Sequence, residues 1–222
     1  MKHTILALAA AAGLAQSAQA HAQVHITEWM YSGGSGEFIE FTNLGPAAVD
    51  FTGWSYDDES AIPGVFDLSG FGLVASGESV VITEATGPDL DLFRLDWGLD
   101  ASVKVLGGVE NNIGRADTLY LFNASGVAVD VLAYGDNSIG GPRTQNTSGR
   151  AGSLAALGAN DATQWVLSSV GDVEGSYMSL SGAVGSPGMT GFTPAVPEPS
   201  TYALLLAGVA VVGAVAQRRR QA

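Results

Sequence analysis

Few residues of this sequence are suited to nucleophilic or transition-metal chemistry. The chain has no cysteine and three histidines, and the histidines are His3, His21 and His25, all near the N-terminus. A Ser–His–Asp triad needs a histidine built into the fold. Zinc and other transition-metal centres are usually bound by histidine or cysteine. The sequence therefore predicts no catalytic residues and a protein that is not an enzyme.

Carboxylates are the remaining candidates for a site, because calcium prefers oxygen ligands. Asp57, Asp58 and Glu59 form the densest acidic run, on a predicted turn after Trp54. A charge run of this kind is also typical of a solvated loop. We take these three residues as the candidate calcium ligands and predict no other cofactor.

Glu37 and Glu40 stand three positions apart in a predicted strand. Because successive side chains of a strand point to opposite faces, an acid–base pair between them is not expected. We expect one carboxylate to be solvated and the other to cap the backbone of a loop.

The charge balance excludes one class of partner. The formal net charge is −13, and Lys2 with Arg218, Arg219 and Arg220 belongs to the terminal segments, so the part between them is more acidic still. An acidic surface repels phosphate groups, which argues against binding to nucleic acid. Without cysteine the domain has no disulfides, and its core alone must stabilise it.

The N-terminal residues have the pattern of a secretory signal peptide. Met1-Lys2-His3 is a short basic start, Thr4–Leu14 is apolar, and Ala18-Gln19-Ala20 has the small-x-small form of a cleavage site. We predict a signal peptide over residues 1–20 and a mature chain that starts near His21.

The middle of the chain, residues 21–188, is predicted to be one all-β domain. Short apolar runs alternate with turns rich in Gly, Ser, Asn and Asp. We expect one short helix at 88–97, a long loop with a short strand or turn over 138–157, and core positions for Trp54 and Trp165. The predicted strands cover 24–31, 37–43, 48–56, 65–68, 79–83, 118–122 and 127–134.

Side-chain alternation predicts which strand faces are buried. In the first strand Val24, Ile26, Glu28 and Met30 are expected on one face. In the strand at 127–134, the valines at 127, 129 and 131 are expected in the core, with Asp130 on the opposite face.

The C-terminal 26 residues, 197–222, contain three adjoining pieces. Pro197-Glu198-Pro199 is an extended stretch, because proline fixes φ and lacks a backbone donor. The apolar run Tyr202–Ala216 carries no charge, and a helix of roughly 15–17 residues spans about 22–26 Å, just short of a hydrocarbon core. Arg218, Arg219 and Arg220 then favour the cytoplasmic side. We predict a single transmembrane helix here, joined to the domain by a linker at 189–196.

This order of Pro-Glu-Pro, apolar helix and arginine tail resembles the PEP-CTERM sorting signal of Gram-negative bacteria. The resemblance implies an exosortase-type sorting protease as partner, and the sorting residues would be Pro197, Glu198, Pro199, Arg218, Arg219 and Arg220. It implies an inner-membrane intermediate with the domain on the periplasmic side, followed by the cell surface or extracellular matrix. An ordinary C-terminal anchor is the alternative.

The domain itself resembles the lamin tail domain over roughly residues 24–188, which implies an immunoglobulin-like β-sandwich without catalytic residues. The blocks that carry the resemblance are Val24–Tyr31, Gly36–Asn43, Val49–Trp54, Asp117–Asn123, Val129-Asp130, Tyr134-Gly135, Gly152–Leu154, Trp165 and Ser186–Gly188.

Together these features predict an exported, non-enzymatic surface or extracellular-matrix protein with an interaction or adhesion module. Its expected partners, besides the sorting protease, are exopolysaccharide or surface proteins. The alternative is an accessory binding domain that works with a separate secreted hydrolase or nuclease.

Overall fold

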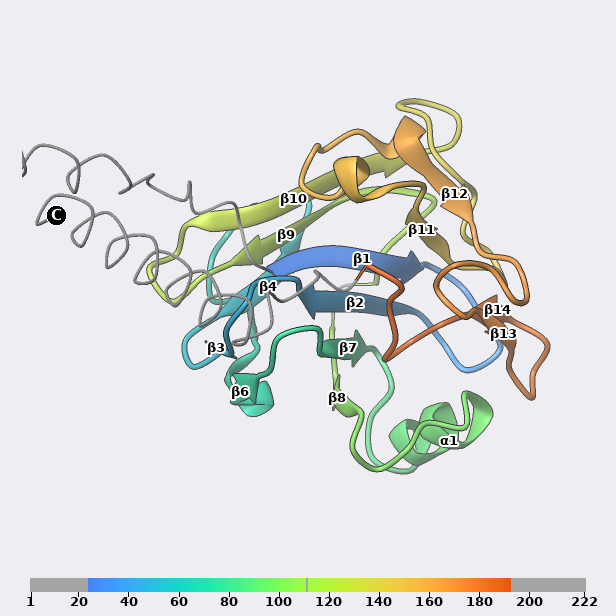
Figure 1. The fold of residues 1–222 in the computed structure, drawn as a ribbon, viewed down its shortest axis with the longest axis horizontal. Coiled ribbons are helices and arrows are strands. Elements are labelled where there is room, and N and C mark those ends of the chain that lie inside the picture. The colour runs from blue at the N-terminus through green and yellow to red at the C-terminus, as the bar shows by residue number, and fades with distance from the viewer. Residues whose placement is uncertain (1–23, 111, 193–222) are drawn as a thin grey trace, which may run out of the picture.

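The computed structural model describes residues 24–110 and 112–192, and their strands form two main sheets (Figure 1). The larger sheet has six strands in the order β12-β11-β1-β2-β7-β8, and the smaller has four in the order β10-β9-β4-β5. The strands of the larger sheet are β1 (Val24–Met30), β2 (Phe38–Asn43), β7 (Ser79–Thr83), β8 (Lys104–Gly107), β11 (Gly149–Ala151) and β12 (Trp165–Leu167). Those of the smaller sheet are β4 (Ser55–Asp58), β5 (Phe66–Asp67), β9 (Ala116–Phe122) and β10 (Ala128–Gly135).

Short elements complete the fold. Two strand pairs, β3 (Val49–Asp50) with β6 (Leu73–Val74) and β13 (Tyr177–Met178) with β14 (Val184–Gly185), lie outside the main sheets. The helix α1 (Pro88–Asp96) agrees with the predicted helix, and the 3-10 turns are η1 (Ser69–Phe71), η2 (Leu154–Ala156) and η3 (Ala162–Gln164). The expectation of an all-β domain is therefore confirmed.

The two main sheets pack face to face around one apolar core. Trp29 of β1 lies 4.9 Å from Tyr134 of β10, and Phe41 of β2 lies 6.1 Å from Tyr56 of β4, measured between ring centroids. These buried aromatic pairs join the sheets into a β-sandwich, because large rings removed from water supply much of the stabilising area.

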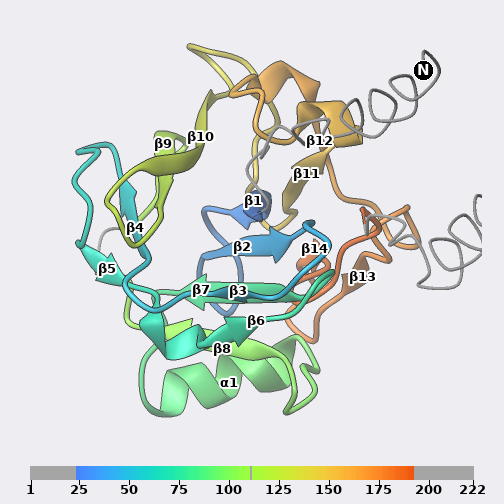
Figure 2. The ribbon, with the colours of Figure 1, turned by 60° about the vertical axis from the view of Figure 1, so that its left-hand side comes forward.

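Helix α1 covers the other face of the larger sheet. In Figure 2 it lies below β7 and β8, whereas β9 and β10 lie above β1. Phe93 and Trp97 pack edge-on against Phe38 at centroid distances of 6.2 and 5.6 Å. The helix starts with Pro88 at its first position and has Asp89 in its first turn, which suits the positive end of a helix.

A β-bulge at Thr27 changes the face of every later residue in β1. Ile26 pairs with Phe41, but Glu28 pairs with Glu40, so Thr27 is an extra residue. Trp29 then joins Ile26 in the core between the sheets. The predicted alternation, with Glu28 on the face of Ile26, is wrong because one inserted residue reverses the pattern.

The hairpin of β9 and β10 is confirmed, but its predicted core face is wrong. Leu132 and Tyr134 are buried, whereas Val127 is 57 % exposed. Asp130 lies on the buried face because it has partners there: its Oδ2 accepts from the Ile26 amide at 2.9 Å and lies 3.2 Å from His25 Nδ1. A buried carboxylate with such partners is tolerated, so the polar residue did not mark the solvent face.

The tryptophans divide into buried and half-buried residues. Trp165 is in the core as predicted, and its ring lies 4.8 Å from that of Trp29. Trp54 is half-buried and stacks on Phe51 at 4.7 Å, at the edge of the core. The fully buried tryptophans of the described residues are Trp29 and Trp97.

Candidate functional site

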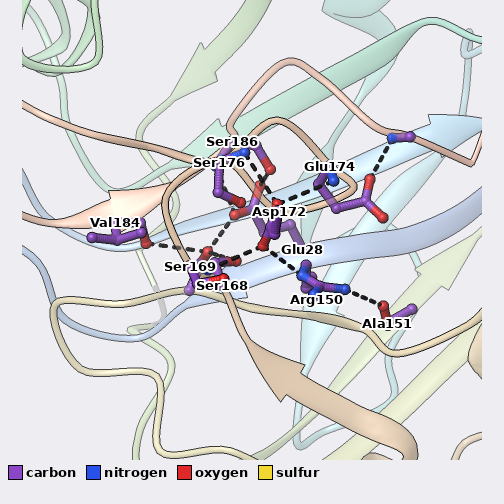
Figure 3. A network of polar contacts seen from close by, with 12 residues as sticks. Glu28, Arg150, Ala151, Ser168, Ser169, Asp172, Glu174, Ser176, Val184 and Ser186 are labelled. Carbon is purple, nitrogen blue, oxygen red and sulfur yellow. Dashed lines mark hydrogen bonds and ion pairs between the residues drawn. The ribbon is translucent and has the colours of Figure 1, made fainter.

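Glu28 of β1 is fully buried and accepts hydrogen bonds from residues near the end of the described part of the chain. Its Oε1 accepts hydrogen bonds from the Ser186 amide at 2.8 Å and from the Ser148 hydroxyl, and its Oε2 accepts from the Ser186 hydroxyl at 3.0 Å (Figure 3). Ser148 is 2.7 Å from the hydroxyl of Ser168. The bulge at Thr27 places this carboxylate on the outer face of the sheet, where the segment that contains Ser186 lies.

Glu40 of β2 stands opposite Glu28 in the strand register. Its Oε2 accepts from the backbone amides of Gly188 at 2.8 Å and Met189 at 3.1 Å, and its Oε1 accepts from the Thr27 hydroxyl at 2.5 Å. The expectation that one of Glu37 and Glu40 caps a loop backbone is confirmed for Glu40.

Glu174 binds the next part of the same segment. Its Oε2 accepts from the Thr190 hydroxyl at 2.8 Å and from the Gly191 amide. The turn that carries Glu174 is fixed by Asp172, which accepts from the Glu174 amide at 3.1 Å and from Arg150 Nε at 2.6 Å (Figure 3). We call Glu28, Glu40 and Glu174 the carboxylate clamp.

The carboxylate clamp holds the stretch Ser186–Gly191 through its backbone amides and hydroxyls. Within residues 24–110 and 112–192, none of the three carboxylates forms an ion pair with Lys, Arg or His. Burial raises the pKa of Glu28 to about 7, against partial opposition from the Ser148 and Ser186 hydrogen bonds. Burial also raises the pKa of Glu40 well above its ordinary value, and the nearby Glu28 adds to this shift. Folding therefore favours the protonated forms of Glu28 and Glu40, the two members of the carboxylate clamp that lie on neighbouring strands.

Glu37 is the other glutamate of this pair, and it was expected to be solvated if Glu40 caps the loop. It is only 2 % exposed. Burial, followed by the neighbouring charge of Glu84, raises the pKa of Glu37 to about 8. The expectation that one of the two glutamates would be solvated is therefore wrong, because Glu37, directly before β2, is buried as well as Glu40.

The calcium candidates lie at the end of β4 and just after it. Asp57 and Asp58 are buried, and Asp57 Oδ2 already accepts from the Ser60 hydroxyl at 2.5 Å and the Ile62 amide at 2.7 Å. Glu59 is exposed. In the part of the chain that the structure describes, no group of three or more His, Cys, Asp or Glu side chains is placed to hold a metal ion. Calcium binding at Asp57, Asp58 and Glu59 stays a prediction.

The predicted signal peptide and the sorting residues Pro197, Glu198, Pro199 and Arg218–Arg220 lie outside the described residues. Among the residues that are described, no helix is long and apolar enough to cross a membrane.

Comparison with protein families settles what the sandwich is. The Lamin Tail Domain family matches residues 17–136, more than half of the chain. The chain belongs to the lamin tail domain family. The PEP-CTERM protein-sorting motif matches residues 195–220. Both resemblances seen in the sequence are therefore confirmed, but the lamin tail match ends at residue 136, and the blocks Gly152–Leu154, Trp165 and Ser186–Gly188 lie outside it. Neither the curated proteins nor the solved structures include a match to this chain.

The sorting motif of this lamin tail domain protein begins close to the carboxylate clamp. The last residue that the clamp binds is Gly191, and the motif match starts at residue 195. Residues 189–191, assigned to the linker from the sequence, contact Glu40 and Glu174. The described fold thus continues almost to the start of the sorting motif.

Sequence reasoning did not find the clamp. Ser186 is 158 positions from Glu28 and Gly188 is 148 positions from Glu40, so no local pattern links them. The available signal was a glutamate inside each of two apolar strands. A carboxylate in a strand buried on both faces needs donors, and those donors had to come from elsewhere in the chain.

Proposed function

We propose that this protein is an exported, non-enzymatic surface or extracellular-matrix protein whose immunoglobulin-like β-sandwich is an interaction module. The sorting motif indicates export and recognition by an exosortase. Neither of the two matching families is a family of enzymes. In this proposal the signal peptide covers residues 1–20, a transmembrane helix lies within 197–222, and the domain is first held on the periplasmic side of the inner membrane.

The observation that carries the proposal is the position of the sorting motif directly after the folded domain. The carboxylate clamp fixes the chain up to Gly191, and three residues, 192–194, separate this point from the motif. The predicted membrane helix begins at Tyr202, so ten residues, 192–201, connect it to Gly191, and ten residues span at most roughly 33–36 Å. The sandwich would therefore stay close to the membrane until Pro197-Glu198-Pro199 is cleaved, and would then leave as a compact unit with a short tail.

Intact mass spectrometry of the protein recovered from cells tests this proposal. We expect a species that starts near His21 and ends near Pro197–Pro199, with both apolar ends removed. Replacing Pro197, Glu198 and Pro199 with alanine should leave the uncleaved form in the inner membrane. Deleting Arg218–Arg220 should impair its orientation there.

A matched control is the replacement of Thr193 and Pro194 with glycine and serine, which alters the connecting chain before the motif match at 195–220 and keeps the Pro-Glu-Pro residues. This variant should be processed normally. Recovery of a mature species that still carries Tyr202–Arg220 would show an ordinary membrane anchor and contradict the sorting proposal.

A further inference from the structure

A groove of about 550 Å³ lies beside α1, away from the carboxylate clamp. Sites for ligands typically have volumes of about 300–1,000 Å³. Four segments that are far apart in the sequence form its walls: the β1–β2 connection at 34–36, residues 84–86 after β7, one face of α1, and the β13–β14 turn at 180–181. Several parts of the fold thus contribute to one concave surface.

Three leucines that line this groove are exposed to solvent. Leu92 and Leu95 of α1 are 58 % and 64 % exposed, and Leu180 of the facing turn is 79 % exposed. Leu92 and Leu95 are three positions apart and share a helix face, whereas Phe93 and Trp97 fill the core beneath α1. A cluster of exposed aliphatic side chains in a concave surface is typical of a binding site.

Carboxylates surround these leucines. Glu84, Asp89 and Asp96 line the groove, and its lining contains no Lys, Arg or His. Asp96 is held in place by Ser181, whose amide and hydroxyl donate to it at 2.6 and 2.9 Å. Partial burial raises the pKa of Asp96, but hydrogen bonds such as those from Ser181 outweigh it and hold the pKa below its ordinary value.

The basic residue of α1 does not neutralise the groove. Arg94 donates to the backbone carbonyl oxygens of Val103 at 3.0 Å and Asp100 at 2.7 Å. It is not part of the groove lining. The groove therefore combines an aliphatic surface with an uncompensated negative charge.

We propose that this groove binds a basic segment of a partner polypeptide that is rich in lysine and aliphatic residues. Lysine ammonium groups complement Glu84, Asp89 and Asp96, and lysine stems and aliphatic side chains cover the three leucines. The groove has no aromatic side chain on which a nucleic acid base stacks, and its charge repels phosphate. The inference rests on the proposed role as an interaction module and names the chemistry of the partner.

Fluorescence anisotropy with the full-length chain in a nonionic detergent tests the groove. The probe is a labelled heptapeptide of three lysines, two leucines and two alanines. We expect saturable binding that weakens with added salt. The double variant Leu92→Ser with Leu95→Ser should lose about tenfold or more in affinity. The control Leu154→Ser changes a leucine that is 61 % exposed outside the groove and should bind like the wild type.

The charge contribution has its own matched pair of variants. Asp89→Asn with Glu84→Gln should lower the affinity and reduce its dependence on salt. Asp91→Asn removes a charge from the same first turn of α1 at a position outside the groove lining, and should leave the affinity unchanged. The same heptapeptide with glutamates in place of the lysines should not bind.

Equal affinity of the wild type and the leucine double variant would overturn the inference, since binding would then be to the acidic surface in general. Binding of the glutamate peptide would overturn it as well. The groove variants should be exported and cleaved like the wild type, because they leave the carboxylate clamp and the sorting residues unchanged. Peptide binding and processing are therefore measured separately, and failure of one does not imply failure of the other.

Discussion

Replacing Trp29 with alanine should lower the free energy of unfolding by about 3–5 kcal/mol, or prevent folding altogether. Trp29 is fully buried, and its ring contacts Tyr134 of the smaller sheet and Trp165 of β12 at 4.9 and 4.8 Å. Removing it leaves a cavity at the point where the two sheets meet, which a close-packed core cannot fill. Urea unfolding followed by circular dichroism measures the loss.

Two controls separate ring volume from other effects. Trp29→Phe should lose much less stability, because Trp29 Nε1 has no hydrogen-bond partner within the described residues and the phenyl ring keeps most of the packing. Trp54→Ala removes a half-buried ring that stacks on Phe51 and should lose less than half as much as Trp29→Ala. A loss below about 1 kcal/mol for Trp29→Ala would contradict the described core.

The second large effect is a fall in stability as the pH rises from about 4.5 to about 7. Burial raises the pKa of Glu28 from 4.5 to about 7. A carboxyl group whose pKa is raised by folding stabilises the folded state fully at pH values below its unfolded pKa, and this contribution is lost as pH rises through the folded pKa. For Glu28 the change corresponds to roughly 3 kcal/mol, lost mainly between about pH 4.5 and 7.

The variant Glu28→Gln tests this dependence, because it keeps an oxygen that accepts from Ser186 but does not titrate. Its unfolding free energy should vary less between pH 5 and 8 than that of the wild type. Glu59→Gln changes an exposed glutamate and should keep the wild-type pH profile. The clamp is not isolated, since Glu40, Glu174 and Tyr177 lie close enough to interact electrostatically with Glu28 or to be shifted by it. A Glu28→Gln profile as steep as that of the wild type would assign the dependence to another group, with Glu37 as the first candidate.

The fold was predictable where local patterns decide it. Alternating apolar residues and turn signals predicted β1, β2, β7, β9 and β10, and Pro88 with the acidic residues that follow it predicted α1. The short strands β8 and β12 of the larger sheet were not predicted, and β11 lies in the stretch expected to be a long loop with a short strand or turn. The faces of two strands were not predictable in the same way. The bulge at Thr27 inserts one residue into β1, and Asp130 is buried because Ile26 and His25 supply partners from another strand.

The carboxylate clamp shows the same limit more strongly. Glu28 and Glu40 appear in the sequence as isolated carboxylates within two apolar strands. Their burial depends on donors from Ser186, Gly188 and Met189, which are 148 to 158 positions away in the sequence. By contrast, the sorting motif consists of adjoining residues, so it was recognisable without any tertiary structure.

Hydrogen–deuterium exchange of the amides that the carboxylate clamp binds tests most directly whether the folded domain continues up to the sorting motif. The amides of Ser186, Gly188, Met189 and Gly191 donate to Glu28, Glu40 and Glu174. At pH 6 they should exchange slowly, with protection comparable to the amides of β1 and β2. Exchange as fast as in an unstructured peptide would show that this segment is not held by the carboxylate clamp, and would contradict the account.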